Sequence, residues 1–226
     1  DVLDEIDRRL KVINAIEQLC SNPSTDELHV LHPLVSQAKW LFGIEYDNMN
    51  YTFNKALTTV LHNILKGQRK GDIDVNWAKR PDLVIGSDFS LSSTCVEDVD
   101  DNDMLIINKV LIIELKRGGF TIDRQEMNQA EEYIDSLYKG NKLNCKPRIK
   151  AFVVGDAVSP AISNQKRLED YGEVYAYTYR QLTQTAGKRL FNLKEKLSVR
   201  YQELNVNDYL LEILGEPRQM ELDFSD

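Results

Sequence analysis

Three charged side chains occur in segments that otherwise have the composition of buried strands. Glu114 and Lys116 interrupt an apolar run of Val, Leu and Ile, and Asp82 precedes a second such run. Side chains of a strand alternate between its faces, so Glu114 and Lys116 share one face with Ile112. Because a buried charge is costly unless it is paired or binds a cation, we expect the three charged residues to converge on adjacent strands.

Two carboxylates and one lysine in a shared site indicate a particular chemistry. Carboxylates that share a site repel each other, and a hard cation such as Mg²⁺ relieves that repulsion with oxygen ligands, with Mn²⁺ expected to substitute. Magnesium lowers the pKa of its bound water and neutralises charge on a phosphoryl oxygen, while a nearby lysine can hold the water or the phosphate. The residues therefore favour metal-assisted hydrolysis of a phosphodiester.

The hydrophobic pattern predicts an α/β domain with a mixed sheet that is flanked by helices on its faces. The expected elements are helices at 2–20, 24–43 (broken or kinked at Pro33) and 53–65, strands at 77–89 and 104–115, a helix at 121–140, strands at 147–158 and 172–182, and a helix at 185–204. The polar, acidic segment at 90–103 is expected to form a loop, which could gate the site or contact a partner.

The segment at 121–140 has the strongest helix pattern. Asp123 and Glu126 have the spacing of an N-terminal cap. Gln125, Gln129 and Tyr133 recur every four residues, so they are expected on one side of this helix. Its apolar stripe comprises Met127, Ala130, Ile134 and Leu137.

Composition indicates an ordinary globular protein of 226 residues with 42% hydrophobic content. We expect a helical N-terminal segment at 1–70 that packs on a core at 71–215, followed by a disordered tail at 216–226. Neither a signal peptide nor an apolar run long enough to cross a membrane is recognised. Three widely spaced cysteines argue against a disulfide framework, so we expect a cytoplasmic protein. Because the sequence begins at Asp1 without an initiating methionine, we expect it to be part of a longer chain.

The charged residues also resemble a known signature. Pro81-Asp82 followed by Glu114 and Lys116 is similar to the P-D and E-x-K motifs of the PD-(D/E)XK nuclease superfamily. The segment IIELKR, followed by a helix with QAEEY, most resembles the nuclease domain of Shedu antiphage defence proteins. The resemblance extends over 78–158. It implies a restriction-endonuclease-like core of α-β-β-β-α-β order with extra N-terminal helices.

The resemblance implies roles for individual residues. Asp82 and Glu114 would bind the metal, and Lys116 would serve the attacking water. The helix with Gln129 and Tyr133 is similar to the Q-x-x-x-Y helix of RecB-type exonucleases, and these two side chains would contact substrate or brace the site.

A further acidic residue is implied on the first core helix, because many members of the superfamily carry one there. Glu27 and Glu45 are the candidates, and Glu27 is preferred as an additional catalytic residue. Its spacing from Ser24 is also that of a capping box, which would give it a purely structural role.

The resemblance implies a DNA substrate, cut to leave 5′-phosphates, in a bacterial defence system. A net charge of −8 does not favour contact with phosphates, so binding in isolation should be weak and salt-dependent. The specificity for DNA could come from homo-oligomers, from missing regions of the same chain, or from an ATPase or sensor partner. The basic segments that could follow the backbone are 67–71, Lys79-Arg80, Lys116-Arg117 with Arg124, and 146–150.

Other interpretations stay open. Glu114 and Lys116 could be a salt bridge at a strand end, and Gln129 and Tyr133 an ordinary helix edge. At the level of the whole domain, a catalytically silent module for protein or nucleic-acid binding is the main alternative. A phosphodiesterase directed at RNA or nucleotides with the same metal site is the third.

Overall fold

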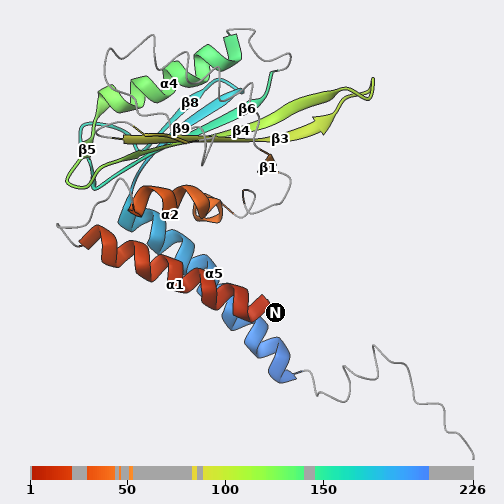
Figure 1. Cartoon of the computed structure of the whole chain (residues 1–226), viewed down its shortest axis with the longest axis vertical. Helices are drawn as coiled ribbons and strands as arrows, with labels where there is room; N and C mark the ends of the chain where they lie inside the picture. The colour runs from red at the N-terminus through yellow and green to blue at the C-terminus, as the bar shows by residue number, and fades with distance from the viewer. Residues whose placement is uncertain are drawn as a thin grey trace, which may run out of the picture.

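A seven-stranded sheet lies between two helical layers (Figure 1). The computed structural model describes residues 2–21, 30–43, 46, 51–52, 83–85, 89–139 and 146–203. Its elements are α1 (Val2–Ser21), α2 (His32–Gln37), η2 (Lys39–Leu41), β1 (Tyr51–Thr52), β2 (Leu83–Ile85), β3 (Phe89–Val99), β4 (Leu105–Lys116), β5 (Thr121–Ile122), α4 (Arg124–Lys139), β6 (Arg148–Gly155), β7 (Ala157–Val158), β8 (Gln165–Leu168), β9 (Gly172–Thr178) and α5 (Tyr179–Glu203).

The sheet is mixed, as the sequence predicts. Its order is β1-β3-β4-β6-β9-β8, and β2 also pairs with β3. Strands β4, β6 and β9 run parallel, whereas β3 and β8 are antiparallel to their neighbours β4 and β9. Helix α4 connects β4 to β6, which is the usual way to join parallel strands. A separate parallel pair, β5 and β7, lies beside this connection.

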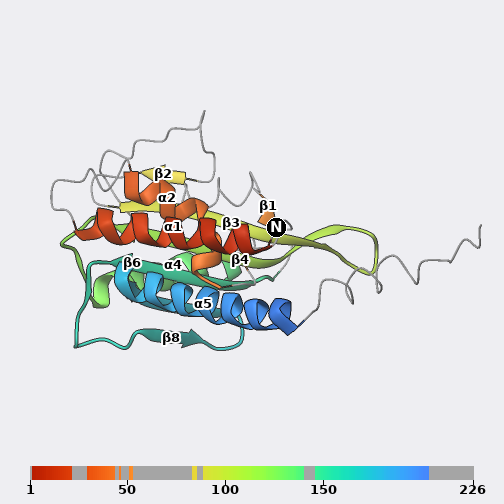
Figure 2. The same ribbon diagram turned by 90° about the horizontal axis from the view of Figure 1, so that it is seen from below.

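The helices divide between the two faces of the sheet. Helix α4 covers one face, while α1, α2 and α5 cover the other, and α1 packs along α5 (Figures 1 and 2). Strand β4 contributes to both cores by alternation: Ile112 packs among the α4 residues, and Ile113 and Leu115 pack among those of α1, α2 and α5. The predicted α/β architecture is therefore confirmed at this level.

Helix α4 begins where its sequence predicts. The backbone N–H of Gln125 donates to Asp123 Oδ1 at 2.7 Å, and the N–H of Asp123 donates to Glu126 Oε2 at 3.0 Å. This reciprocal pair satisfies N–H groups that the first helical turn leaves without partners. The predicted apolar stripe, Met127, Ala130, Ile134 and Leu137, is buried against the sheet.

The prediction of a long acidic loop at 90–103 is wrong. Residues 90–99 belong to β3, and the chain turns only between Asp100 and Met104. Asp100 Oδ1 accepts from the N–H groups of Asn102 and Met104, each at 2.9 Å, which fixes a tight hairpin. The polar composition of this segment predicted a loop, but Ser90 and Ser92 are buried inside the sheet despite their hydroxyls.

The strand that follows Asp82 is not a neighbour of β4, contrary to the prediction of adjacent strands. Strand β3 lies between them, with Val84 of β2 opposite Leu91 and Leu91 opposite Glu114. Two strand spacings separate β2 from β4, about 10 Å instead of about 5 Å. The two motifs are in one sheet, as predicted, but on opposite sides of an intervening strand.

The last strand and helix meet earlier than predicted. Strand β9 ends at Thr178 and α5 begins at Tyr179, whereas the sequence pattern placed the helix start at 185. Thr178 and Gln181 form a capping box: each backbone N–H donates to the other side chain, at 2.9 and 3.0 Å. The edge strand β8 was not predicted. The helix expected at 53–65 and the tail at 216–226 lie outside the described residues.

Close packing of α4 on β9 predicts a stability difference between two glycines. A Cβ on Gly172 would lie 2.7 Å from Cγ2 of the buried Ile134, so Gly172→Ala should lower the free energy of unfolding by about 1–3 kcal/mol. In α5, a Cβ on Gly187 would lie 3.8 Å from Ile13 Cδ1, an ordinary contact. Gly187→Ala should therefore be neutral or stabilising by up to about 1 kcal/mol. Urea unfolding of both variants checks this, and equal effects would contradict it.

Candidate functional site

Glu114 and Lys116 form a buried ion pair on the α4 side of β4. Lys116 Nζ lies 2.8 Å from Glu114 Oε1, and the two side chains are only 3% and 1% exposed. Leu91 of β3 and Val153 of β6 flank Glu114 in the sheet. The predicted shared face is thus confirmed. Two charges in a central strand lose their hydration, which a single ion pair seldom fully offsets. The arrangement is costly to the fold.

Two contacts besides the ion pair hold Lys116 in place. Its ammonium lies 5.1 Å from the ring centroid of Phe120, close enough for a cation–π interaction. The hydroxyl of Tyr179 donates to the carbonyl oxygen of Lys116 at 2.7 Å, so the start of α5 fixes the end of β4. Just beyond, Gly119 has φ of +71°, a conformation that suits glycine and turns the chain towards β5.

Two more carboxylates, at the N-terminus of α4, lie within the electrostatic influence of Lys116. Hydrogen bonds, first of all that from the Gln125 N–H, lower the pKa of Asp123 below its usual value. The opposite holds for Glu126, because burial raises the pKa of its carboxyl even though the Lys116 charge acts to lower it. Sequence reasoning treated both residues as helix caps. The periodic pattern gave no signal that they also belong to the surroundings of Lys116.

The raised pKa of Glu126 predicts a pH-dependent contribution to stability. A carboxyl whose folded-state pKa is raised stabilises the fold at low pH, and this contribution is lost as the pH rises through the folded-state value. Glu126→Gln cannot titrate and keeps an oxygen that can accept from Asp123. The wild-type free energy of unfolding should therefore fall relative to that of Glu126→Gln between about pH 4 and about pH 7. Chemical unfolding across this range checks the trend, and a constant difference would contradict it.

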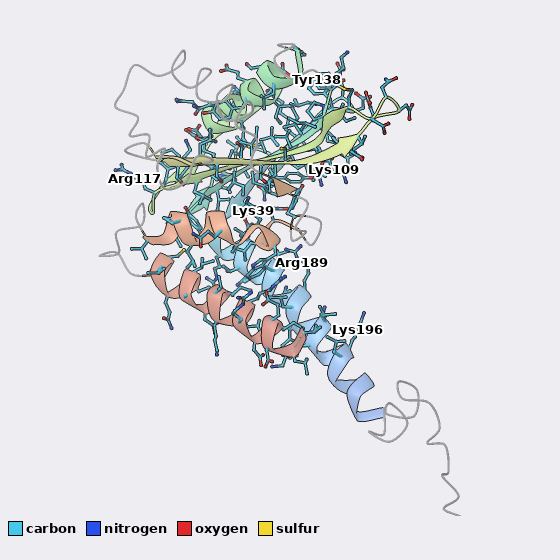
Figure 3. The ribbon with its side chains drawn as sticks, turned by 45° about the vertical axis from the view of Figure 1, so that its right-hand side comes forward. Lys39, Lys109, Arg117, Tyr138, Arg189 and Lys196 are labelled. Atoms are coloured by element: carbon cyan, nitrogen blue, oxygen red, sulfur yellow. The ribbon has the colours of Figure 1, made fainter. Side chains whose placement is uncertain are left out.

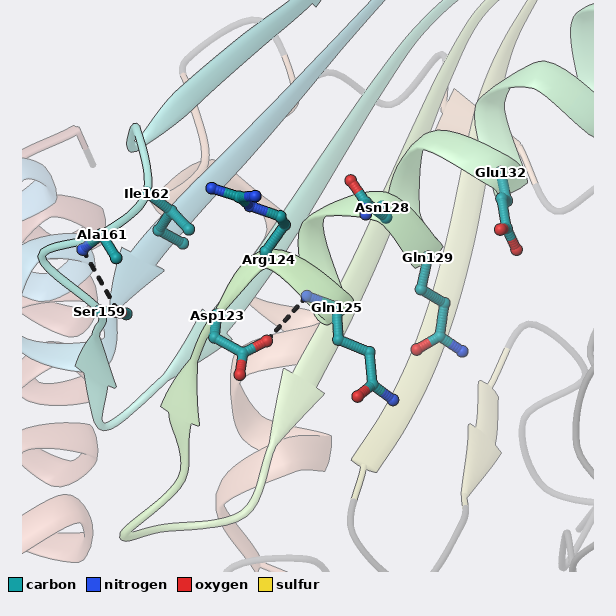
Figure 4. Close-up of a pocket in the computed structure, with 9 residues that line it drawn as sticks. All are labelled: Asp123, Arg124, Gln125, Asn128, Gln129, Glu132, Ser159, Ala161 and Ile162. Carbon is teal, nitrogen blue, oxygen red and sulfur yellow. Dashed lines mark hydrogen bonds between the residues drawn. The ribbon is translucent and has the colours of Figure 1, made fainter.

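An open pocket of about 890 Å³ lies beside the first turns of α4 (Figure 4). It is lined by Asp123, Arg124, Gln125, Asn128, Gln129, Glu132, Ser159, Ala161 and Ile162. Two predicted substrate-binding residues, Arg124 and Gln129, thus line one pocket. In Figure 4 Gln125 and Gln129 extend on one side of the helix, and Arg124 and Asn128 on the other. Asn128 and Glu132 were missed, because polar residues on a helix surface carry no distinguishing pattern.

The other predicted substrate-binding residues occupy different positions. Tyr133 is fully buried in the core under α4, which fits a bracing role and not contact with substrate. Arg117 is exposed directly after β4, at the end of the sheet opposite to Lys109 (Figure 3). Asp82, Glu27 and Glu45 lie outside the described residues, so the positions of the second metal ligand and of the additional acidic residue stay predictions.

The side chains around Glu114 determine whether a metal ion could bind there. Within the described parts of the chain, no group of three or more His, Cys, Asp or Glu residues is arranged to hold a metal ion. Glu114 supplies oxygen donors of the type that Mg²⁺ prefers, beside a lysine. A magnesium site at Glu114 stays a prediction, because Asp82, its predicted second ligand, lies outside the described residues.

Among the described residues, no helix has both the length and the apolar character needed to cross a membrane. Comparisons with protein-family models, with curated proteins and with solved structures find no match to this chain.

Proposed function

We propose that the chain is a metal-dependent DNA nuclease domain of the PD-(D/E)XK type, with a restriction-endonuclease-like core and a role like that of Shedu defence nucleases. The observation that carries the proposal is the buried Glu114–Lys116 pair in the middle of a sheet. Such a pair is not needed for a stable strand, since apolar residues would serve the fold as well or better. Lys116 also interacts electrostatically with Asp123, which lines the open polar pocket, and this link supports a chemical role for the pair.

The residues support a division of labour in phosphodiester hydrolysis. Glu114 and Asp82 would hold Mg²⁺, which supplies charge neutralisation at a phosphoryl oxygen when bound. Lys116 donates hydrogen bonds to the attacking water or to the scissile phosphate, from a position fixed by Glu114 and Tyr179. Gln129 positions the substrate from the side of α4.

Two cationic residues near this end of the sheet suit a DNA backbone. Arg117 follows β4 and Arg124 begins α4, and both are exposed. The basic segment at 146–150 does not join them, because Arg148 and Lys150 alternate onto the α5 side of β6 together with Phe152. Among the described residues, we therefore assign the DNA path to the region of Arg117 and Arg124, whereas the predicted basic segments at 67–71 and 79–80 lie outside the described residues.

Nicking of supercoiled plasmid tests the proposal. The purified chain should convert supercoiled to open-circular DNA with Mg²⁺ or Mn²⁺, and EDTA should stop the reaction. Parallel reactions with single-stranded DNA and with RNA separate a DNA nuclease from a phosphodiesterase of other specificity. Folded protein that cuts none of these polymers with either metal would overturn the proposal.

Arg124→Ala should weaken DNA binding without changing the fold. Loss of one phosphate contact should reduce the slope of log affinity against log salt concentration by about 1. Fluorescence anisotropy with a labelled duplex, at several salt concentrations, measures this slope. Lys188→Ala, an exposed charge change on α5, is the matched control and should leave the slope unchanged. Equal slopes for both variants would remove Arg124 from the DNA path.

A catalytically silent binding module is the second candidate, and one observation favours it. The side chains of Glu114 and Lys116 are almost completely inaccessible in this conformation, so a substrate phosphate cannot reach them without a rearrangement. DNA binding with the salt dependence given above, together with absent cleavage, would support this candidate.

A further inference from the structure

A second pocket lies on the other face of the sheet and at its other end. It has a volume of about 460 Å³ and is lined by Tyr46, Lys109, Val110, Arg148, Lys150, Glu173 and Tyr175. Lys109 is seven residues before Lys116 on β4, a distance of roughly 23 Å along a strand. Lys109 and Arg117 accordingly label opposite ends of the sheet in Figure 3. The pocket cannot be part of the site around Glu114.

The register of three parallel strands concentrates positive charge in this pocket. Lys109 pairs with Arg148, and Lys150 pairs with Glu173, so their side chains share the α5 face. Arg167 on β8 adds a fourth cation, with its Nε 3.6 Å from Glu173 Oε1. Among the described residues of this cluster, one carboxylate thus faces four cationic groups, in a protein whose overall charge is −8. The local excess attracts anions.

The ion pairs with Glu173 are long. Arg148 and Lys150 lie 4.0 and 3.9 Å from its oxygens, beyond the range of a direct hydrogen bond. Arg148 is also 62% exposed, and no ion pair joins Lys109 to another described residue. An anionic ligand could therefore engage Arg148 and Lys150 without breaking a direct hydrogen bond to Glu173.

Glu173 is held at the centre of the pocket. The hydroxyl of Tyr175 donates to Glu173 Oε2 at 2.9 Å, and the side-chain amide of Gln165 donates to that hydroxyl at 3.2 Å. Burial, followed by the bond to Glu173, raises the pKa of Tyr175 to about 12, so the hydroxyl stays protonated and oriented. The other carboxylate oxygen, Oε1, lies 4.0 Å from Arg148 and 3.6 Å from Arg167 and can accept a hydrogen bond from a ligand.

Aromatic rings form one wall of the pocket. Tyr175 stacks on Phe152 with centroids 4.8 Å apart, and Tyr46 packs edge-on to Phe152 at 6.3 Å. Lys150 lies over the ring of Tyr46, 5.8 Å from its centroid. Rings ordered in this way offer an apolar surface next to the charged groups, where a planar group could pack.

We propose that this pocket binds a nucleotide. The phosphates would contact Lys109, Arg148 and Lys150, a ribose hydroxyl or base amino group would donate to Glu173, and the base would pack on the tyrosines. Glu173 makes the pocket more suitable for a nucleotide than for an anion without hydrogen-bond donors. A bare polyanion would meet a repelling carboxylate, whereas a nucleotide carries both the negative charge and the donors to satisfy it. The volume also falls in the range of small-molecule sites.

Isothermal titration calorimetry of the whole chain with ADP tests the proposal. EDTA in the buffer keeps metal-dependent chemistry out of the measurement, so the outcome is independent of nuclease activity. ADP should bind, and the double variant Arg148→Ala, Lys150→Ala should bind it at least about tenfold more weakly. Lys109→Ala should also weaken binding.

The matched control is Lys166→Ala. Lys166 is a neighbour of Arg167 on β8 but pairs with Glu131 of α4 on the opposite face, so its loss should leave ADP affinity unchanged. Inorganic phosphate and an oligothymidylate strand are the competing ligands. The proposal is overturned if ADP does not bind, if all variants bind it equally, if phosphate binds as tightly as ADP, or if only the oligonucleotide binds. Thermal melting of each variant excludes unfolding as the cause of lost binding.

Discussion

Replacing Glu114 with Gln should abolish metal-dependent nicking of plasmid DNA. The amide has nearly the same shape but no charge with which to hold a divalent cation, and a cation at the reacting phosphate is worth several kcal/mol of transition-state stabilisation. A loss of that size lowers the rate by roughly a thousandfold or more. The rate constant for loss of supercoiled plasmid, measured over a range of Mg²⁺ and Mn²⁺ concentrations, is the readout.

The control for this prediction is Glu195→Gln. Glu195 is exposed on α5, and its replacement makes the same chemical change far from β4. It should cut at the wild-type rate. Nicking by Glu114→Gln at the wild-type rate would show that the cleavage belongs to another site or to a contaminant. Restoration of activity at high Mn²⁺ would instead place Glu114 at the metal, as proposed.

Sequence periodicity correctly predicted the elements whose faces are either clearly buried or clearly exposed. Helix α4 has one buried face and one exposed face, so its period of 3.6 residues and its cap residues specify it. From Val110 onward, strand β4 is buried on both faces, and there an apolar run broken only by Glu114 and Lys116 identifies it. These two elements also carry Glu114, Lys116 and Gln129 of the predicted site.

Sequence reasoning failed where tertiary contacts override composition. Strand β3 is rich in Ser and acidic residues, yet it is paired on both edges, and pairing decides its conformation. At the start of α5, the Thr178 and Gln181 capping box lies inside a run of tyrosines that favours a strand. The capping spacing was a usable signal that the aromatic residues concealed.

The second pocket could not be found from the sequence. Lys109, Arg148 and Glu173 come from three strands and meet only through their register. A linear reading instead grouped Arg148 with the other basic segments as part of one DNA path. The alternation of side chains along β6 separates Arg148 from the Arg117 and Arg124 region, because it directs Arg148 and Lys150 to the face opposite Glu114.

The Glu114–Lys116 pair should show strong and unequal effects of single substitutions on stability. Lys116→Met leaves a buried carboxylate without its cation and should lower the free energy of unfolding by about 3–5 kcal/mol. Glu114→Gln should cost less, because the remaining ammonium still interacts with Asp123 and Glu126 at the start of α4. Urea unfolding of each variant at neutral pH measures both values.

The double variant Glu114→Gln, Lys116→Met completes the cycle and separates folding from catalysis. With both charges removed, no uncompensated charge is buried, so its stability should exceed that of Lys116→Met and approach the wild-type value. Additive losses would mean that the pair is not coupled and would remove the physical basis for treating it as one unit. A double variant that is as stable as the wild type but does not nick DNA would mean that these charges serve cleavage and not the fold. Wild-type nicking by that variant would have the opposite meaning, and the buried pair would then be a structural feature of β4.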